Sequence, residues 1–410
     1  MSVTVNSSSA TSPDSSASPS PAKPIRLDFL DGMRGLAALC VLFVHLRGQC
    51  IEGLAHPSNR LISSTNWMSY GKDAVAVFIV LSGFCLMLPT VRFADRRLNG
   101  GLLQFFKRRS LRILPPYYAA LVLGILSILA VDVLKRHTHL SDGAKNAAAN
   151  LTAGNILSHA FLIHDFRNAW AFGIEPPMWS VAVEWHIYFI FALLLLPLRR
   201  KAGIWITVAA AFLLGCAPHL LLPAQNNFDW ACPWFIGLFA VGMLGAEIAF
   251  SDIPSLVSIR DRTPWSAVSI ALAITTYGIA ATLLKLRDVD IIMHPLLGCL
   301  CVSVILMCIR QVRSGNAAFP LHPLRMLESR AAMILGSFSY SLYLVHGLLI
   351  TRVRVFMQLH HFHTPVYVLG VLVGGAALSL IAAYIFHLLF EKPFMTAKMK
   401  RLKTEENRAR

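Results

Sequence analysis

Four ionisable side chains lie inside apolar stretches of the chain that are long enough to cross a membrane. They are His45, Asp73, Glu184 and His346. Polar groups at membrane depth are costly in free energy and usually face a cavity, so they point to a functional site. A neutral imidazole there can take a proton from a hydroxyl group, and a nearby carboxylate can orient the ring and stabilise the imidazolium. The residues therefore predict proton-transfer chemistry, with His45 as the general base and Asp73 or Glu184 as its orienting group.

Helical spacing places these groups relative to one another. Arg34 and His45 are eleven residues apart, about 1100° of helical rotation, so they share one face with about 16 Å between them along the axis. Ser339, Tyr343 and His346 follow at i, i+4 and i+7 and form one polar stripe. The same rise puts both histidines about 8 to 10 Å below the outer surface. We expect the two histidines and the two carboxylates to meet at this depth.

A second candidate site is basic. Arg34 lies inside its span, and Arg109 and Arg112 begin the third apolar stretch on the same side. Guanidinium groups bind phosphate oxygens in a bidentate manner, so these arginines could hold the phosphates of a cytosolic donor such as an acyl-coenzyme A. The flanking Lys107 and Arg108 are interpreted instead as charges that set topology and contact lipid head groups.

Ten apolar segments must position these groups, since about 20 apolar residues cross the hydrocarbon layer. The predicted spans are about 30–49, 72–91, 111–133, 179–198, 203–223, 229–250, 264–284, 291–309, 332–351 and 366–390. A short amphipathic helix is expected over 150–164, at the membrane interface. With the N-terminus inside, the cytoplasmic segments hold 25 Lys or Arg residues and the external ones 11, so both termini are predicted to be cytoplasmic.

Composition agrees with a membrane protein. Of 410 residues, 56% are hydrophobic and 14% are charged, whereas soluble domains carry about 25% charged residues. The net charge of +16 is concentrated in two short segments, 92–112 and 392–410, each next to an apolar run. This pattern is typical of topology signals and argues against a nucleic-acid partner. The predicted class is an all-α, multi-pass integral membrane protein of about ten spans, in the cell inner (plasma) membrane.

Three regions follow from the composition along the chain. Residues 1–24, rich in Ser and Pro, are predicted to be a disordered tail without the features of a secretory signal. Residues 25–393 form the transmembrane domain, and 394–410 form a basic cytoplasmic tail. Most of the eight cysteines lie in apolar runs without metal-ligand spacing, so we predict no disulfide framework and no metal site.

Six motifs together resemble the membrane acyltransferase-3 family, whose members are O-acyltransferases that modify polysaccharides, lipopolysaccharide, Nod factors and some macrolides. The matching stretches are LDFLDGMRGLAALCVLFVH (27–45), GKDAVAVFIVLSGF (71–84), RRSLRILPPYY (108–118), WSVAVEWHIYF (179–189), GSFSYSLYLVH (336–346) and FEKP (390–393). They appear in the family's order and spacing, from residue 27 to 393.

The resemblance assigns family motif positions to this chain. They fall on Arg34, His45, Asp73, Ser82, Arg109, Arg112, Trp179, Ser180, Glu184, Tyr343 and His346. Where many members have Glu-Glu-Gln, this chain has Glu184, Trp185 and His186, so a second carboxylate is missing. Many members also carry a C-terminal hydrolase domain, and we expect acceptor delivery here to depend on the membrane domain or a partner.

The resemblance implies an enzyme that transfers an acyl group, in the first instance acetyl, from acyl-coenzyme A to a hydroxyl of a cell-surface carbohydrate. No permanently bound cofactor is expected. Transfer could be direct or could pass through an acyl group on a side chain. The alternative function is a transporter or flippase of a small molecule or lipid-linked sugar, because intramembrane His, Asp and Glu also serve as proton relays. Against it, no inverted repeat with broken spans is evident.

Overall fold

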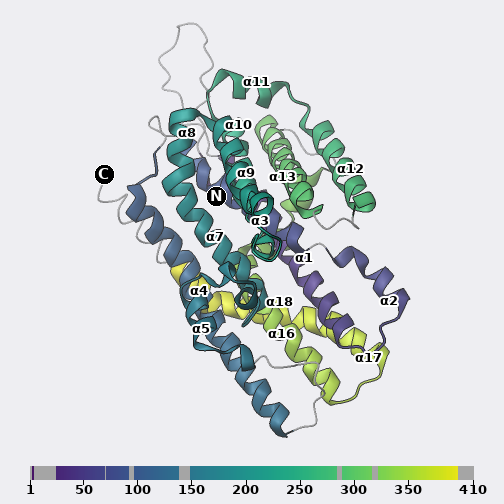
Figure 1. Cartoon of the computed structure of the whole chain (residues 1–410). Coiled ribbons are helices and arrows are strands. Elements are labelled where there is room, and N and C mark those ends of the chain that lie inside the picture. The colour runs from purple at the N-terminus through teal and green to yellow at the C-terminus, as the bar shows by residue number, and fades with distance from the viewer. Residues whose placement is uncertain are drawn as a thin grey trace, which may run out of the picture.

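The computed structural model describes residues 2–3, 25–69, 71–91, 97–137, 148–283, 289–315 and 322–395. Within these residues the regular secondary structure is helical except for two short strands, β1 (Ser2–Val3) and β2 (Ile25–Arg26), which pair antiparallel (Figure 1). The predicted tails lie outside the described residues, apart from Ser2, Val3 and residues 394–395. The disorder predicted for residues 1–24 and the cytoplasmic position predicted for residues 394–410 therefore stay predictions.

Long helices build the membrane domain. They are α1 (Phe29–Glu52), α3 (Gly71–Val91), α4 (Gly101–His137), α7 (Trp179–Ile190), α9 (Ile204–Leu221), α10 (Phe235–Phe250), α12 (Trp265–Leu283), α13 (Val289–Ser314), α16 (Ser339–Leu359) and α18 (Gly375–Phe386). Helix α7 continues through a π-helical turn, η6 (Phe191–Leu195), into α8 (Leu196–Ala202). The last span joins α17 (Thr364–Leu369), η8 (Gly370–Gly374), α18 and η9 (His387–Glu391).

Shorter helices connect these spans. They are α2 (Asn59–Ser64), η1 (Asn66–Met68), η3 (Ala148–Asn150), α5 (Ala153–Ala160), η4 (His164–Phe166), α6 (Asn168–Ala171), η5 (Pro176–Met178), η7 (Asp229–Ala231), α11 (Pro254–Arg262), α14 (Pro323–Leu327) and α15 (Arg330–Ser337). The structure thus contains a short helix, α5, within the predicted interfacial segment 150–164. It packs on α4, where Tyr117 donates a hydrogen bond to the His159 carbonyl over 2.9 Å.

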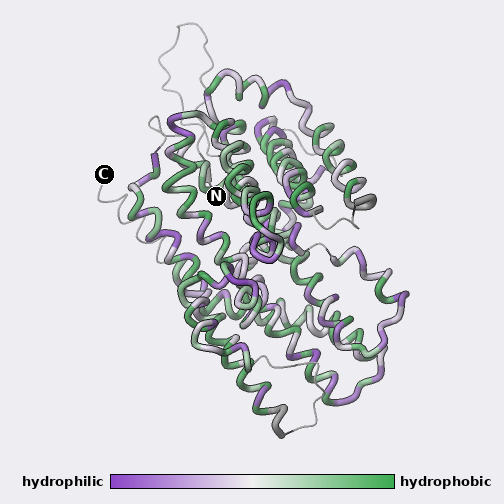
Figure 2. Tube along the Cα trace, in the orientation of Figure 1, coloured by the Kyte–Doolittle hydropathy of each residue, from purple (hydrophilic) through white to green (hydrophobic). Residues whose placement is uncertain are grey.

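Nine helices in the described part of the chain are long and apolar enough to cross a membrane. A tenth apolar helix, Trp265–Ile279, is shorter and corresponds to the predicted span 264–284. Apolar residues run along almost every long helix in Figure 2. Helices suit this setting because each satisfies its backbone hydrogen bonds internally, where no water is available. The protein is an all-α, multi-pass membrane protein.

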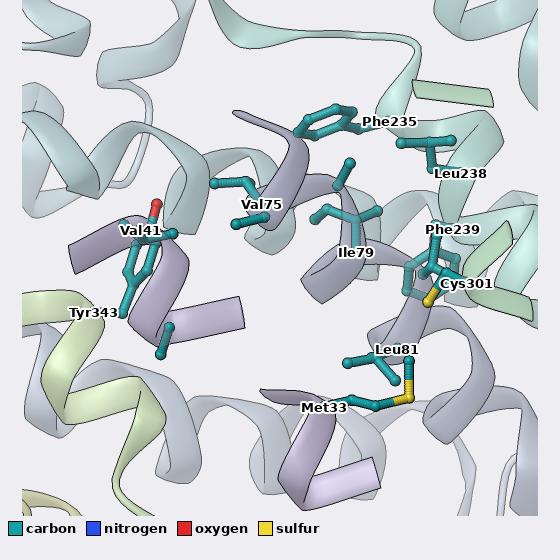
Figure 3. Close-up of a cluster of buried hydrophobic side chains, with 14 of the residues drawn as sticks. Met33, Val41, Val75, Ile79, Leu81, Phe235, Leu238, Phe239, Cys301 and Tyr343 are labelled. Carbon is teal, nitrogen blue, oxygen red and sulfur yellow. The ribbon is translucent and has the colours of Figure 1, made fainter. Parts of the chain in front are cut away.

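Glycine allows helix α3 to approach α10 closely, and helix α1 to approach α14 closely. A Cβ atom on Gly83 of α3 would collide with the Phe239 carbonyl of α10, and one on Gly32 of α1 would collide with the Leu327 carbonyl. The side chain of Phe239 packs beside Ile79 of α3 in the core (Figure 3). Small residues allow such close backbone approach between membrane helices.

Two predicted spans have different boundaries in the structure. The segment predicted over 332–351 is broken at Phe338, where α15 ends and α16 begins, and α15 packs against α1 through Gly35 and Gly336. The crossing helix therefore starts seven residues later and extends to Leu359. The predicted span 111–133 is part of the 37-residue helix α4, so Lys107, Arg108 and Arg109 just before it are already helical.

Candidate active site

A cavity of about 320 Å³ lies between α1, α3, α4, α7 and α16. Eight of the twelve predicted site residues line it: Arg34, Ser82, Arg109, Arg112, Ser180, Glu184, Ser339 and Tyr343. Val75, Phe78 and Ile79 of α3 contribute apolar wall. The helices are distant in sequence, so this convergence is a property of the tertiary fold.

Arg34 is held at one end of the cavity by two side chains. It donates to Asp31 Oδ1 over 2.7 Å, one turn earlier on α1, and to Cys85 Sγ of α3 over 3.0 Å. Its side chain is 18% exposed. Asp31 partly neutralises Arg34, while Arg109 and Arg112 of α4 add two more positive charges to the same cavity. The cavity is therefore suited to an anionic ligand.

Glu184 connects α7 to α3 at the cavity wall. Ser82 donates to its Oε1 atom over 2.5 Å, and Tyr188, one turn later on α7, donates to the same oxygen. The Arg109 guanidinium lies 6.0 Å from the centre of the Tyr188 ring. Glu184 thus belongs to the basic cavity, as a hydrogen-bonded carboxylate that offsets part of the arginine charge.

The two predicted histidines meet directly. His45 Nδ1 lies 3.1 Å from His346 Nε2, and the ring centres are 4.7 Å apart. His45 Nδ1 is also 2.9 Å from the Val41 carbonyl, and His346 Nδ1 is 2.9 Å from the Leu342 carbonyl, each one turn earlier in its own helix. Helices α1 and α16 thus bring together residues 301 positions apart.

These contacts determine the tautomers of both neutral rings. A carbonyl oxygen only accepts, so His346 carries its proton on Nδ1 and its Nε2 is a lone-pair acceptor. His45 faces two acceptors at Nδ1, namely Val41 O and His346 Nε2, so its proton lies there as well. His45 Nε2 is then unprotonated, which is the form that a general base requires.

Tyr343 separates the histidine pair from the cavity. Its ring lines the cavity, its centre is 6.1 Å from that of His346, and its hydroxyl is 2.5 Å from Ser180 Oγ. In Figure 3 the Tyr343 side chain lies beside Val41, one turn before His45. Tyr343 and Ser180 therefore form the wall between the basic cavity and the general base.

Contrary to the prediction from helical spacing, the two carboxylates do not lie beside His45. Neither Asp73 nor Glu184 is a hydrogen-bond or ion-pair partner of His45 within the described residues. Gly71 packs against Val44, so α3 does begin at the depth of His45. Ser82, which binds Glu184, lies nine residues beyond Asp73 on α3, or about 13 Å further along the helix axis. The predicted common depth is thus wrong for Glu184.

Asp73 has a different partner. Its Oδ1 atom is 3.5 Å from His294 Nε2 of α13, and Trp234 Nε1 donates to His294 Nδ1 over 2.9 Å. His294 is fully buried in this chain of contacts. Trp179 packs on Phe235 at the start of α7, with ring centres 6.2 Å apart, and supports the position of its neighbour Ser180.

Three residues near these groups were not predicted from the sequence: Asp31, Tyr188 and Glu175. Asp31 and Tyr188 lie three or four residues from a predicted site residue, so helical spacing could have found both. Glu175 precedes two prolines and gave no signal. It is 3% exposed, its Oε1 atom is unpaired, and a Cβ atom on Gly347, next to His346, would collide with it. Burial raises the pKa of Glu175 to about 8, although Arg352 opposes the shift.

All eight cysteines are free, and no group of three His, Cys, Asp or Glu side chains among the described residues could hold a metal ion.

Comparison with known proteins gives one family match. A family model described as an acyltransferase domain, of the acyltransferase-3 type, covers residues 27–384. Similar curated proteins include the O-acetyltransferase OatA of Staphylococcus aureus, 26% identical over 180 residues, which are 43% of this chain and 26% of OatA. YrhL of Bacillus subtilis, provisionally named a peptidoglycan O-acetyltransferase, is 24% identical over 196 residues, which are 47% of this chain and 26% of YrhL.

A third relative matches over most of its length. The acyltransferase MdmB of Streptomyces mycarofaciens is 25% identical over 354 residues, which are 80% of each chain. By contrast, the chain spans about a quarter of the length of OatA and YrhL. No solved structure matches the chain.

Proposed function

The chain belongs to the acyltransferase-3 family, and from this premise we propose that it transfers an acyl group, in the simplest case acetyl, from acyl-coenzyme A to a hydroxyl group of a carbohydrate. One observation carries the proposal: a cavity with three arginines lies next to a histidine whose Nε2 atom is free to act as a base. The first part suits an anionic donor and the second suits hydroxyl activation.

The donor's phosphates would bind at Arg34, Arg109 and Arg112. Guanidinium groups match phosphate oxygens in geometry and stay charged, and the apolar walls partly exclude water, which strengthens the attraction. Lys and Arg residues dominate the loops at this end of the bundle, so we place it on the cytoplasmic side, where acyl-coenzyme A is found. Arg34 and His45 are about 16 Å apart along α1, a distance that the donor's extended thioester arm could span.

His45 would perform the proton transfer. Its Nε2 atom takes the proton of the acceptor hydroxyl while the hydroxyl oxygen attacks the thioester carbonyl carbon. The carbon–sulfur bond then breaks, and the sulfur leaves with the proton that His45 returns. The pair with His346 holds the His45 ring in the required tautomer and shares the positive charge that develops on it. His346 therefore takes the orienting role first assigned to Asp73 or Glu184.

Tyr343 and Ser180 would control the passage between donor and base. The thioester must pass the wall that they form in order to reach His45. Breaking one hydroxyl contact costs about 1 kcal/mol, which donor binding can readily offset.

The carbohydrate acceptor is proposed from the family and from the names of its relatives, two of which refer to O-acetylation. A direct test uses the purified chain in vesicles with radiolabelled acetyl-coenzyme A and cell-envelope glycans. We expect label to appear in the glycan and to disappear with His45→Ala. Coupled ion or lipid flux without label in any glycan would instead favour the transporter alternative.

A further inference from the structure

A second basic cavity, of about 340 Å³, lies at the ends of α10, α11, α12 and α13. Three arginines line it, Arg260, Arg310 and Arg313, together with a single carboxylate, Asp261. Asp261 accepts a hydrogen bond from Arg260 over 2.9 Å, and its side chain is 61% exposed. The cavity therefore keeps an excess of two positive charges. None of these residues belongs to the site described above.

Backbone carbonyls hold the arginines in place without neutralising them. Arg313 donates to the Ala249 carbonyl over 2.6 Å and lies 5.1 Å from the centre of the Phe250 ring, while Arg310 donates to the Thr263 carbonyl over 3.1 Å. Each guanidinium has five N–H donors, so most of them stay available to a ligand. The guanidinium groups are thus fixed in position for binding an anion.

This cavity opens at the same end of the bundle as the first one. The ring of Phe250 packs on Phe84 of α3, and the next residue, Cys85, accepts the hydrogen bond from Arg34. In Figure 1 α11 crosses the bundle between the ends of α10 and α12, on the side away from α16 and α17. Both basic cavities therefore lie where we place the cytoplasmic leaflet, a leaflet rich in anionic lipids.

The walls distinguish a lipid from a soluble anion. Trp265, Leu306 and Ile309 provide an apolar surface beside the arginines. From Trp265, α12 runs into the membrane and exposes Ile270 and Ile274, 62% and 67% accessible, so its outer face is free for an acyl chain. Tryptophan is favoured at the membrane interface, and basic pockets between membrane helices bind phosphate head groups.

We propose that this cavity binds the phosphate of an anionic phospholipid, with Arg310 and Arg313 on the phosphate oxygens and the acyl chains along α12. The arginine pairs supply the charge-assisted hydrogen bonds, and Trp265 packs against the glycerol portion. The site is separate from the basic cavity that contains Arg34, Arg109 and Arg112, so the proposal does not depend on the acyltransferase function.

Lipid retention by the 410-residue chain tests the proposal. The detergent-purified chain is titrated with phosphatidylglycerol, with phosphatidylcholine of the same acyl chains and with soluble glycerol 3-phosphate, and bound ligand is counted by native mass spectrometry. We expect one phosphatidylglycerol per chain, bound in preference to phosphatidylcholine. Arg310→Gln combined with Arg313→Gln should weaken it about tenfold or more, because charge-assisted hydrogen bonds are lost.

The matched control is Arg262→Gln combined with Arg330→Gln, which removes two exposed arginines from outside the cavity. It should leave the affinity within about twofold, because head-group attraction by net charge alone is weak and diffuse. Equal losses in both double variants, or equal binding of the two lipids, would overturn the proposal. Binding of glycerol 3-phosphate without phosphatidylglycerol would overturn the lipid assignment. If the double variant does not fold, Arg310→Gln alone tests the same contact.

Discussion

The basic cavity lined by Arg34, Arg109 and Arg112 and the histidine pair lie on opposite sides of Tyr343. Their side chains are held in place by different kinds of contact. In the cavity, side chains from separate helices hold one another in place. Ser82 donates a hydrogen bond to Glu184, and Cys85 accepts one from Arg34. Each histidine is instead fixed by a carbonyl one turn earlier in its own helix and then by the other histidine. Donor binding and proton transfer thus depend on different residues. Substitutions in the cavity should therefore change the donor Kd, and substitutions in the histidine pair should change kcat.

Loss of the base should have the largest effect. His45→Ala removes the free Nε2 atom, and we expect kcat to fall about 10²- to 10⁴-fold, the usual contribution of a general base. The affinity for acetyl-coenzyme A should stay unchanged, since His45 does not line the basic cavity. Single-turnover kinetics and equilibrium donor binding would check this. The exposed His363, changed to alanine, is the control, and a His45→Ala protein with normal kcat would refute the base assignment.

Loss of a cavity arginine should act on binding instead. Arg34→Gln or Arg109→Gln removes charge-assisted hydrogen bonds worth about 1.5 to 3 kcal/mol, so the Kd for acetyl-coenzyme A should rise about 10- to 100-fold. Isothermal titration would measure it. Lys107→Gln, on the same helix but exposed and outside the cavity, should change it little. Unchanged donor affinity in both arginine variants would move the donor site elsewhere.

The orienting role of His346 predicts a graded loss. His346→Ala should lower kcat about 100-fold with little change in KM, because the His45 ring is no longer held in position. His346→Gln should retain more activity, since its amide oxygen can accept from His45 Nδ1. The pH–rate profile of the glutamine variant should shift, because an amide cannot share the positive charge that develops on His45. Equal losses in both variants, with an unchanged profile, would indicate a packing role only.

Substitution of Asp73 tests whether this carboxylate acts on the general base. Because it binds His294 and not His45, Asp73→Asn should lower kcat less than about tenfold, the cost of weakening one partly exposed contact. Steady-state kinetics beside His45→Ala would compare the two effects directly. A loss as large as that of His45→Ala would show that Asp73 acts on the base after all.

The smallest expected effect concerns stability and pH. Burial raises the pKa of Glu175 to about 8 from an ordinary value near 4.5, so the folded chain binds a proton that the unfolded chain releases between these values. The contribution of Glu175 to stability is then fully present below about pH 4.5 and is lost as the pH rises toward 8. Glu175→Gln should raise Tm by about 2 °C at pH 8.5 and hardly change it at pH 5. The opposite pH trend would contradict the assignment.

Much of the fold could be predicted from the sequence, because the membrane imposes a simple rule of length and apolarity. The apolar runs predicted the positions of the spans. The polar stripe of α16 was also correct, since Ser339 and Tyr343 line the cavity and His346 follows them. The break at Phe338 was not foreseen, because small and polar residues such as Gly336, Ser337 and Ser339 also occur within unbroken membrane helices.

The sequence by itself determined which side chains are available: a helix of known rise fixes the spacing of Arg34 from His45 and the face shared by Tyr343 and His346. It could not determine partners across helices, because helix rotation and crossing depend on packing among residues hundreds of positions apart. The tertiary structure therefore decided that His346 contacts His45, that Asp73 contacts His294, and that Glu184 joins the arginines.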